Sequence, residues 1–186
     1  SAEAARLLYL VGIAEKDKKS AEKYILWTDE KTEGKDADIT SSLIIFYFDN
    51  NEQSKGTERY NKAMKSTDKA FVSEVNYNVG QYYMTKNNNA QAKTYLQKAY
   101  TGAPQKVNGA GILLAEIAMS EKNTAQAEKY LTEMNTAAGG KNTQILEMLG
   151  TFYLQKGDAT KAEQFLSKAV AAEPKNVEAK VLLLGI

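Results

Sequence analysis

The same amphipathic segment occurs three times in this chain at a fixed spacing. Residues 87–104 read NNNAQAKTYLQKAYTGAP, residues 157–174 read GDATKAEQFLSKAVAAEP, and NTAQAEKYLTEMNTAAGG at 123–140 aligns with both without a gap. Two copies end in Pro104 and Pro174, the only prolines of the chain, as expected where a helix must stop. A helical segment repeated about every 35 residues restricts the fold strongly, because such periods are typical of stacked repeat proteins.

Extending the alignment toward the N-terminus gives five units that fill the chain. One position carries a small residue in every unit, at spacings of 35, 36, 35 and 35 residues: Ala21, Gly56, Ala92, Ala127 and Ala162. A second recurring position lies twelve residues before each of these: Tyr9, Ile44, Gly80, Ala115 and Gly150. We expect the small residues to lie where paired helices approach closely, because a larger side chain there would force the backbones apart.

Each unit therefore carries two apolar stripes joined by a short polar stretch, such as KGD at 156–158, which predicts a helical hairpin. A single hairpin cannot bury its apolar faces, so identical hairpins stack. We predict an all-α fold, an α-α superhelix that forms one solenoid over residues 1–186. The units are expected at about 2–36, 37–72, 73–107, 108–142 and 143–177, with 178–186 beginning a sixth unit or a capping helix.

The third and fifth units resemble the tetratricopeptide repeat family. The fifth unit carries the pattern Leu149-Gly150-x-x-Tyr153, Ala162, Phe165-Leu166, Ala169 and Pro174. The third carries Val79-Gly80-x-x-Tyr83, Ala92, Tyr95-Leu96, Ala99 and Pro104. The other three units keep the spacing but have degraded motifs. The resemblance implies a right-handed superhelix whose first helices line a concave face, and it implies that partner proteins bind there as extended peptides or helices.

Composition excludes several kinds of chemistry. The chain has no His and no Cys, so the usual general base, the usual zinc ligands and thiol catalysis are missing. We expect no catalysis, no metal and no cofactor. The formal net charge is +1, which disfavours nucleic acid as a partner, and the apolar runs at 7–14 and 43–48 are too short to span a membrane.

The helical register indicates which side chains face the groove. The candidate partner-binding residues are Leu10, Ile13, Ile45, Phe48, Tyr77, Asn78, Gln81, Met84, Glu116, Glu147 and Thr151. The segment LIIFYF at 43–48 is apolar all round, and such a helix is normally buried on every side. Two interpretations stay open: Ile45, Phe46 and Phe48 pack against flanking helices, or Leu10, Ile13, Ile45 and Phe48 form an exposed apolar patch.

These observations favour a non-catalytic scaffold that binds another protein. The alternatives are a glycan-binding module of an exported bacterial protein and an RNA-binding helical repeat. The Tyr-, Asn- and Lys-rich, Cys-free composition leans toward an exported or periplasmic bacterial protein. Because terminal repeats normally need a polar outer face, the apolar end at 181–186 predicts either a longer parent protein or self-association through this C-terminal segment.

Overall fold

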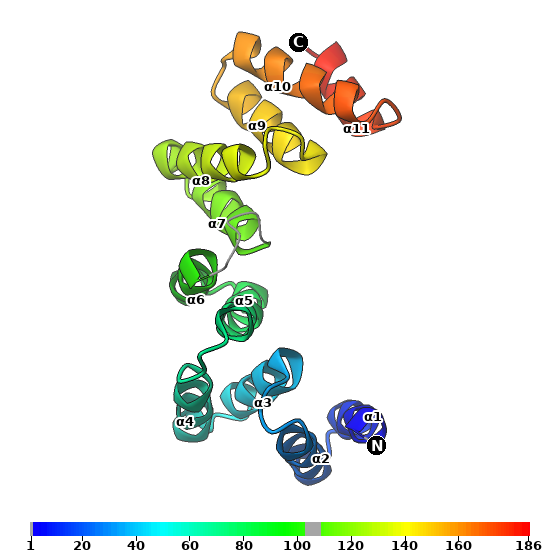
Figure 1. Ribbon diagram of the computed structural model, residues 1–186, viewed down its shortest axis with the longest axis vertical. Coiled ribbons are helices and arrows are strands. Elements are labelled where there is room, and N and C mark those ends of the chain that lie inside the picture. The colour runs from blue at the N-terminus through cyan, green and yellow to red at the C-terminus, as the bar shows by residue number, and fades with distance from the viewer. Residues whose placement is uncertain (1, 103–108) are drawn as a thin grey trace. The chain divides into compact units, whose positions relative to one another are not determined.

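Every regular element in the residues that the computed structural model describes, 2–102 and 109–186, is an α-helix (Figure 1). The helices are α1 (Ala2–Ala14), α2 (Lys18–Lys31), α3 (Ala37–Asp49), α4 (Gln53–Ala63), α5 (Lys69–Thr85), α6 (Asn89–Gly102), α7 (Gly109–Ser120), α8 (Thr124–Ala137), α9 (Thr143–Gln155), α10 (Ala159–Ala172) and α11 (Val177–Leu184). Helix α10 ends two residues before Pro174, as predicted, whereas Pro104 lies outside the described residues.

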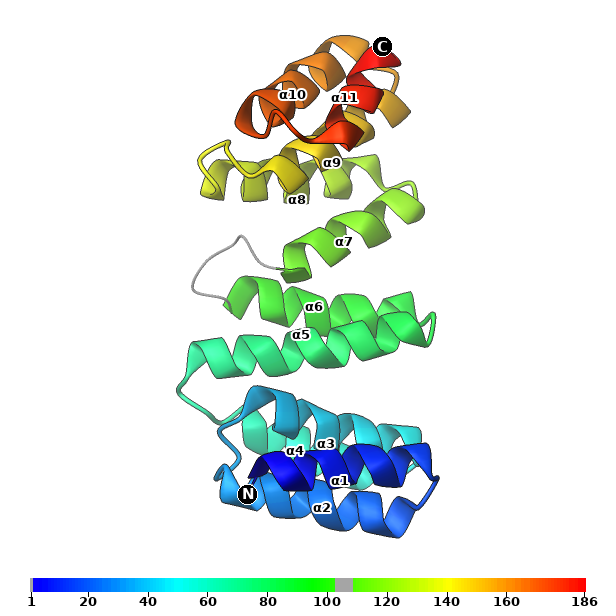
Figure 2. The same cartoon turned by 90° about the vertical axis from the view of Figure 1, so that its right-hand side faces the viewer.

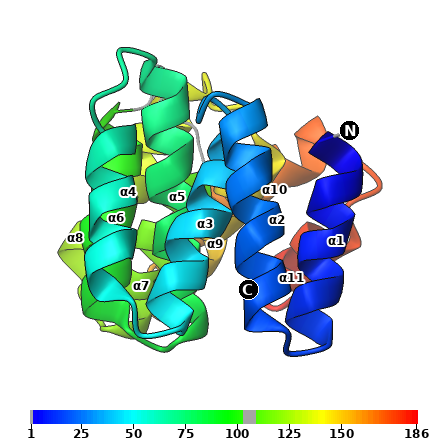
Figure 3. The ribbon, with the colours of Figure 1, turned by 90° about the horizontal axis from the view of Figure 1, so that it is seen from below.

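Consecutive helices pack as hairpins, in the order α1 with α2, α3 with α4, α5 with α6, α7 with α8, and α9 with α10. Figure 2 shows the α5–α6 pair lying side by side, and Figure 3 shows the α1–α2 pair. Helix α11 packs against α10. This arrangement is the sequential hairpin packing of an all-α solenoid, which the sequence predicts.

The turn inside each of the five hairpins has a left-handed residue at the same position and the same pattern of backbone hydrogen bonds. One residue in each turn has a positive φ, between 55° and 78°: Lys16, Asn51, Asn87, Lys122 and Gly157. These positions follow one another at the same 35- or 36-residue spacings as the small residues. Four of the five are not glycine, so the tight turn carries a conformational cost in those four hairpins.

The chain divides into two compact parts, each made of several repeats. We call them the N-terminal unit (residues 1–104) and the C-terminal unit (residues 105–186). In both units the small residues lie where helices approach closely, as predicted. A Cβ placed on Gly80 would lie 2.7 Å from Cγ of Leu96, and one placed on Gly150 would lie 2.5 Å from Cγ of Leu166. These leucines come from the second helix of the same hairpin, so glycine is required at both contacts.

Helix α3 settles the choice between the two interpretations of its apolar sequence. Ile44 and Phe46 are buried, and Phe48 is only 6% exposed because its ring packs over Gly56 of α4 and against Tyr83 of α5. The apolar side chains of α3 therefore pack against flanking helices, with Ile45 half-buried. Assigning Phe48 to a binding surface is thus wrong, because its side chain fills the core of the N-terminal unit.

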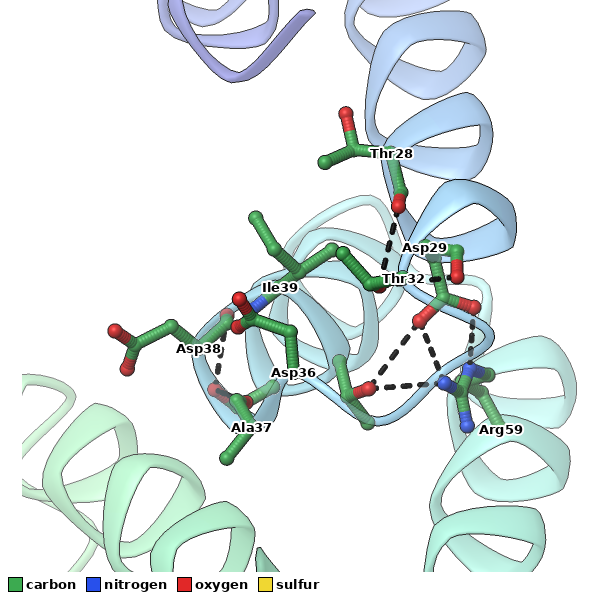
Figure 4. Close-up of polar contacts among 10 residues, drawn as sticks. Thr28, Asp29, Thr32, Asp36, Ala37, Asp38, Ile39 and Arg59 are labelled. Atoms are coloured by element: carbon green, nitrogen blue, oxygen red, sulfur yellow. Dashed lines mark hydrogen bonds and ion pairs between the residues drawn. The ribbon is translucent and has the colours of Figure 1, made fainter. Parts of the chain in front are cut away.

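A buried ion pair joins the first two hairpins of the N-terminal unit (Figure 4). Nε of Arg59 on α4 donates to Oδ2 of Asp29 on α2 at 3.0 Å, and Nη2 donates to Oδ1 of Asp29 at 2.5 Å. The same Nη2 donates to Oγ1 of Thr40 at the start of α3 at 2.9 Å. Three helices thus meet at one bidentate guanidinium contact, a geometry that lysine could not provide.

Candidate functional site

The first helices α3 and α5 of the N-terminal unit carry a row of polar side chains that bond to one another. Nδ2 of Asn78 on α5 donates to Oδ1 of Asp38 at 3.1 Å and to Oγ of Ser41 at 3.0 Å, both on α3. One helical turn further on, Nε2 of Gln81 donates to the hydroxyl of Tyr77 at 2.9 Å. We call this row, with the half-buried Ile45 beside it, the α3–α5 surface.

Charged groups flank the α3–α5 surface at both ends. Near the start of α5, partial burial and the neighbouring carboxylates of Asp38 and Asp36 raise the pKa of Glu74. At the other end, Asp49 accepts a hydrogen bond from the hydroxyl of Tyr82 at 3.0 Å and pairs with Nζ of Lys86 at 2.8 Å. Burial, and then the bond to Asp49, raise the pKa of Tyr82. The surface is therefore acidic at one end and neutralised at the other.

Helix α1 presents the exposed apolar side chains that the sequence predicts. Leu10 is 52% exposed and Ile13 is 46% exposed, and Leu7 and Val11 on the same helix are exposed as well. Of the predicted apolar patch, only these α1 residues are fully at the surface. Met84, near the end of α5, is half-buried.

In the C-terminal unit, the predicted residues do not form one cluster of mutual hydrogen bonds. Glu116 on α7 is exposed, whereas Glu147 and Thr151 on α9 are half-buried. The carboxylate of Glu147 accepts a hydrogen bond from Nδ2 of Asn176, the residue that caps α11. Glu147 thus contributes to the packing of α11 beside α9.

A cleft of about 380 Å³ opens between the C-terminal ends of α7 and α9. Its lining residues are Met119, Lys122, Thr124, Phe152, Gln155 and Lys156. Phe152 forms part of its apolar lining, and Nζ of Lys156 lies 5.7 Å from the centre of the Phe152 ring. None of the candidate partner-binding residues predicted from the sequence lines this cleft. The cleft is the space left between side chains of neighbouring helices, and such a space cannot be read from helical periodicity.

The second helices carry five exposed lysines: Lys62, Lys98 and Lys168 occupy one position of the repeat, and Lys23 and Lys129 lie four positions earlier in it. Lys98 nevertheless has a structural contact, because its Nζ donates to the hydroxyl of Tyr60 at 3.1 Å. Within residues 2–102 and 109–186, no group of acidic side chains is arranged to hold a metal ion. None of the described helices combines the length and apolar character needed to cross a bilayer.

Comparison with known proteins identifies the repeat. Residues 73–106 and 143–176 match the model of the tetratricopeptide repeat. The fold is similar to that of PilW, a widely conserved type IV pilus biogenesis factor, with a TM-score of 0.65 and 16% identity over 98% of this chain and 83% of that one. A structure of pilF from Pseudomonas aeruginosa gives a TM-score of 0.59 and 19% identity over 100% and 82% of the two chains.

YrrB, described as a tetratricopeptide repeat protein with an unusual peptide-binding site, gives a TM-score of 0.59 and 16% identity over 93% of this chain and 87% of that one. The comparison with curated proteins gives no match. The chain packs as consecutive helical hairpins with glycines at close helix contacts. This arrangement places it in the class of helical repeat proteins. Within that class, two of the five repeats, residues 73–106 and 143–176, match the tetratricopeptide repeat, and nearly the whole chain has the fold of the tetratricopeptide repeat protein YrrB.

Proposed function

We propose that this protein is a non-catalytic scaffold that binds a segment of a partner protein along its first helices. The observation that carries this proposal is the α3–α5 surface, where Asn78 and Gln81 are held in place by Ser41, Asp38 and Tyr77. Side chains fixed before binding lose little rotamer freedom when a partner arrives, so their remaining hydrogen-bonding capacity contributes more to affinity.

The surroundings of this surface also suit a peptide. Leu10 and Ile13 offer exposed apolar area in the same unit, and apolar side chains of a partner require such contacts. The absence of His and Cys leaves no obvious nucleophile–base pair, which agrees with a scaffold role. The match of two repeats to the tetratricopeptide repeat, and the fold shared with YrrB, a repeat protein with an unusual peptide-binding site, support the same class of partner.

Affinity capture from a lysate of the source cells tests this proposal. The groove variant changes the α3–α5 surface and combines Ile45→Ser, Asn78→Ala and Gln81→Ala. These changes remove the half-buried apolar side chain and two side-chain amides, and they leave the buried Phe48 unchanged. The control variant combines Lys129→Ala and Lys168→Ala, two exposed lysines on second helices. A partner protein retained by the parent and the control, and lost by the groove variant, supports the proposal.

Two other outcomes count against it. A partner retained equally by all three proteins places binding away from the α3–α5 surface. A partner lost only by the lysine control places it on the second helices. Both variants are first checked for unchanged helical content and melting, so that loss of binding is not loss of fold.

A second copy of the chain is a further partner that we propose, with α11 as the contact. Val181 and Leu184 are 61% and 88% exposed. The residues 35 positions earlier in the repeat, Leu146 and Leu149, are buried within the C-terminal unit. An apolar helix face without a cover among the described residues favours association of copies.

A further inference from the structure

The cleft between α7 and α9 lies at the same repeat position as the ends of α3 and α5. The side chains at the two places differ, and this difference suggests a ligand for the cleft. Counting by the repeat spacing, the ends of α3 and α5 in the N-terminal unit correspond to the ends of α7 and α9. The equivalent residues are Phe48 and Met119, Asp49 and Ser120, Asn51 and Lys122, Tyr82 and Phe152, and Lys86 and Lys156. The first site is filled by the protein's own side chains, whereas the second holds the cleft.

At the α3–α5 end, the chain supplies its own anion. The carboxylate of Asp49 accepts the Tyr82 hydroxyl and pairs with Lys86, while the buried ring of Phe48 occupies the space beneath. Cation, carboxylate and apolar filler are all present. At this end of the N-terminal unit, the lysine is therefore already paired and the apolar space is already filled by the chain's own side chains.

At the α7–α9 end, the first helix supplies neither the carboxylate nor the ring, and the lysine that remains pairs with Glu128 of α8. Ser120 stands where Asp49 would be, and its hydroxyl bonds to the carbonyl of Ile117 in its own helix. The unbranched side chain of Met119 replaces the ring of Phe48, and Phe152 lacks the hydroxyl of Tyr82. The result is an apolar space beside a lysine whose carboxylate partner comes from α8 instead of from the first helix.

The charge around the cleft is also more positive than at its counterpart. Lys122 replaces Asn51, and in the described part of the chain it makes no ion pair. Lys156 pairs with Oε2 of Glu128 at 2.7 Å, yet its side chain stays 42% exposed and has further donors. Glu128 also accepts from the Tyr153 hydroxyl at 2.8 Å, so it is held on the α8 side.

We propose that this cleft binds an acidic side chain, aspartate or glutamate, together with an adjacent apolar side chain from an extended segment of a partner protein. The carboxylate takes the place that Asp49 fills in the N-terminal unit, next to Lys122 and Lys156. The apolar side chain fills the space over Met119 and Phe152. This inference rests on the proposed scaffold function, because it assigns the chemistry of one part of the bound segment.

Two blocked peptides provide the test: acetyl-Gly-Ser-Leu-Glu-Ser-Gly-amide and the same peptide with Gln in place of Glu. Each is titrated into the isotope-labelled full chain, and backbone amide shifts are followed by NMR. We expect saturable shifts at Met119, Lys122 and Phe152, with the Gln peptide binding about fivefold more weakly because it lacks the charge. The side-chain carboxylate is the only anion of the Glu peptide, since both peptide ends are blocked.

Matched variants separate the cleft from general attraction to lysine. Ser120→Asp supplies the carboxylate that the N-terminal unit has, so it should close the site and weaken binding of the Glu peptide about fivefold or more. Lys122→Ser should weaken it to a similar extent. Lys129→Ser, a change at an exposed lysine of α8 outside the cleft, should leave the affinity unchanged.

Three results would overturn the inference: equal affinity for the two peptides, equal affinity of Ser120→Asp and parent, or no saturable shifts at the cleft up to the solubility of the peptide. None of them bears on partner capture by the α3–α5 surface, which is measured separately. Failure of the cleft and failure of the scaffold function are therefore distinguishable.

Discussion

Single residues decide how closely the helices of a hairpin approach. Gly150 is the clearest case, because any side chain there meets Leu166 at its branch point rather than at a flexible tip. The same contact between Gly80 and Leu96 occurs in the N-terminal unit. The repeat pattern predicts both contacts from the sequence alone, because Gly80 and Gly150 occupy the same position of the repeat, twelve residues before Ala92 and Ala162.

We expect Gly150→Ala to destabilise the protein by about 1–3 kcal/mol, because Leu166 must leave its rotamer or the helices must separate. Gly102→Ala is the matched control, since an added Cβ at Gly102 meets nothing within 4 Å. Urea unfolding followed by circular dichroism measures both. A Gly150→Ala variant as stable as the control would show that the hairpin can widen freely.

The buried Asp29–Arg59 pair is a second residue-scale determinant. Replacing Arg59 by Met leaves Asp29 buried without its cation, which costs about 3–5 kcal/mol, whereas Asp29→Asn with Arg59→Met removes both charges and should recover much of that loss. The exposed pair of Lys35 with Glu33 is the comparison, and removing it should change stability by less than about 1 kcal/mol. Thermal unfolding of the single and double variants distinguishes the two cases.

Tyr60 gives the N-terminal unit a dependence on alkaline pH. Burial raises its pKa to about 12, while in the unfolded chain the hydroxyl ionises near 10. The folded state thus holds the proton more tightly, so this contribution to stability is complete below about pH 10 and is lost as the pH rises toward 12.

We therefore expect the unfolding free energy of the parent to fall over this pH range, and to fall less steeply in Tyr60→Phe. Urea titrations at several pH values measure the slope. Equal slopes in the two proteins would mean that the phenol of Tyr60 ionises as easily in the folded chain as in the unfolded chain.

Some residue-scale features carry no signal in the sequence. Asp29 and Arg59 lie 30 positions apart in segments with many other charges, and nothing in either segment shows that Asp29 is buried against Arg59. The helical register predicts Phe48 at the surface, but α3 packs against helices on both sides and Phe48 is buried between them. Helical periodicity predicts which residues share a face, but the number of neighbours covering that face is a property of the tertiary structure.

At the scale of the element, most of the described helices begin after a polar residue whose side chain accepts a hydrogen bond from the first turn, whereas Glu52 before α4 makes no such bond. Asp17, Asp36, Asp68, Asn123, Asn142, Asp158 and Asn176 have this role. Together with the left-handed turn residues, these caps fix where each helix of a hairpin starts. The sequence shows the polar stretches but not which residue of each is left-handed.

Removing one cap should shorten one helix without changing the fold. In Asp158→Ala, α10 loses the bond that the Asp158 carboxylate accepts from the backbone N–H of Lys161 at 3.0 Å, and we expect a loss of about 1 kcal/mol. Asp158→Asn keeps the acceptor and should retain most of the stability. Urea unfolding compares the two, and equal losses would show that charge rather than the hydrogen bond matters.

At the scale of the whole molecule, the composition agrees with a protein that binds through local surfaces. The formal net charge of +1 gives no overall field that would attract a partner of opposite charge, which agrees with the proposed binding at the α3–α5 surface. The sequence predicts the all-α repeat fold and the polar row at Tyr77, Asn78 and Gln81. It does not predict the cleft, which depends on the difference between two equivalent positions in space.

Self-association is the prediction that belongs to the molecule as a whole. Light scattering should show the average mass of the parent rising with concentration, because Val181 and Leu184 expose apolar surface on α11. Val181→Glu combined with Leu184→Glu should keep the protein monomeric over the same range. A parent that stays monomeric at all concentrations would contradict this role of α11.

The single tryptophan provides an optical reporter for half of the chain. Trp27 lies on α2 in the N-terminal unit, where Nζ of Lys31 is 5.5 Å from its ring centre, and the C-terminal unit has tyrosine but no tryptophan. Tryptophan emission therefore follows one unit, whereas circular dichroism follows both. Where the two melting curves separate, the chain melts in two steps, and the step without a fluorescence change belongs to residues 105–186.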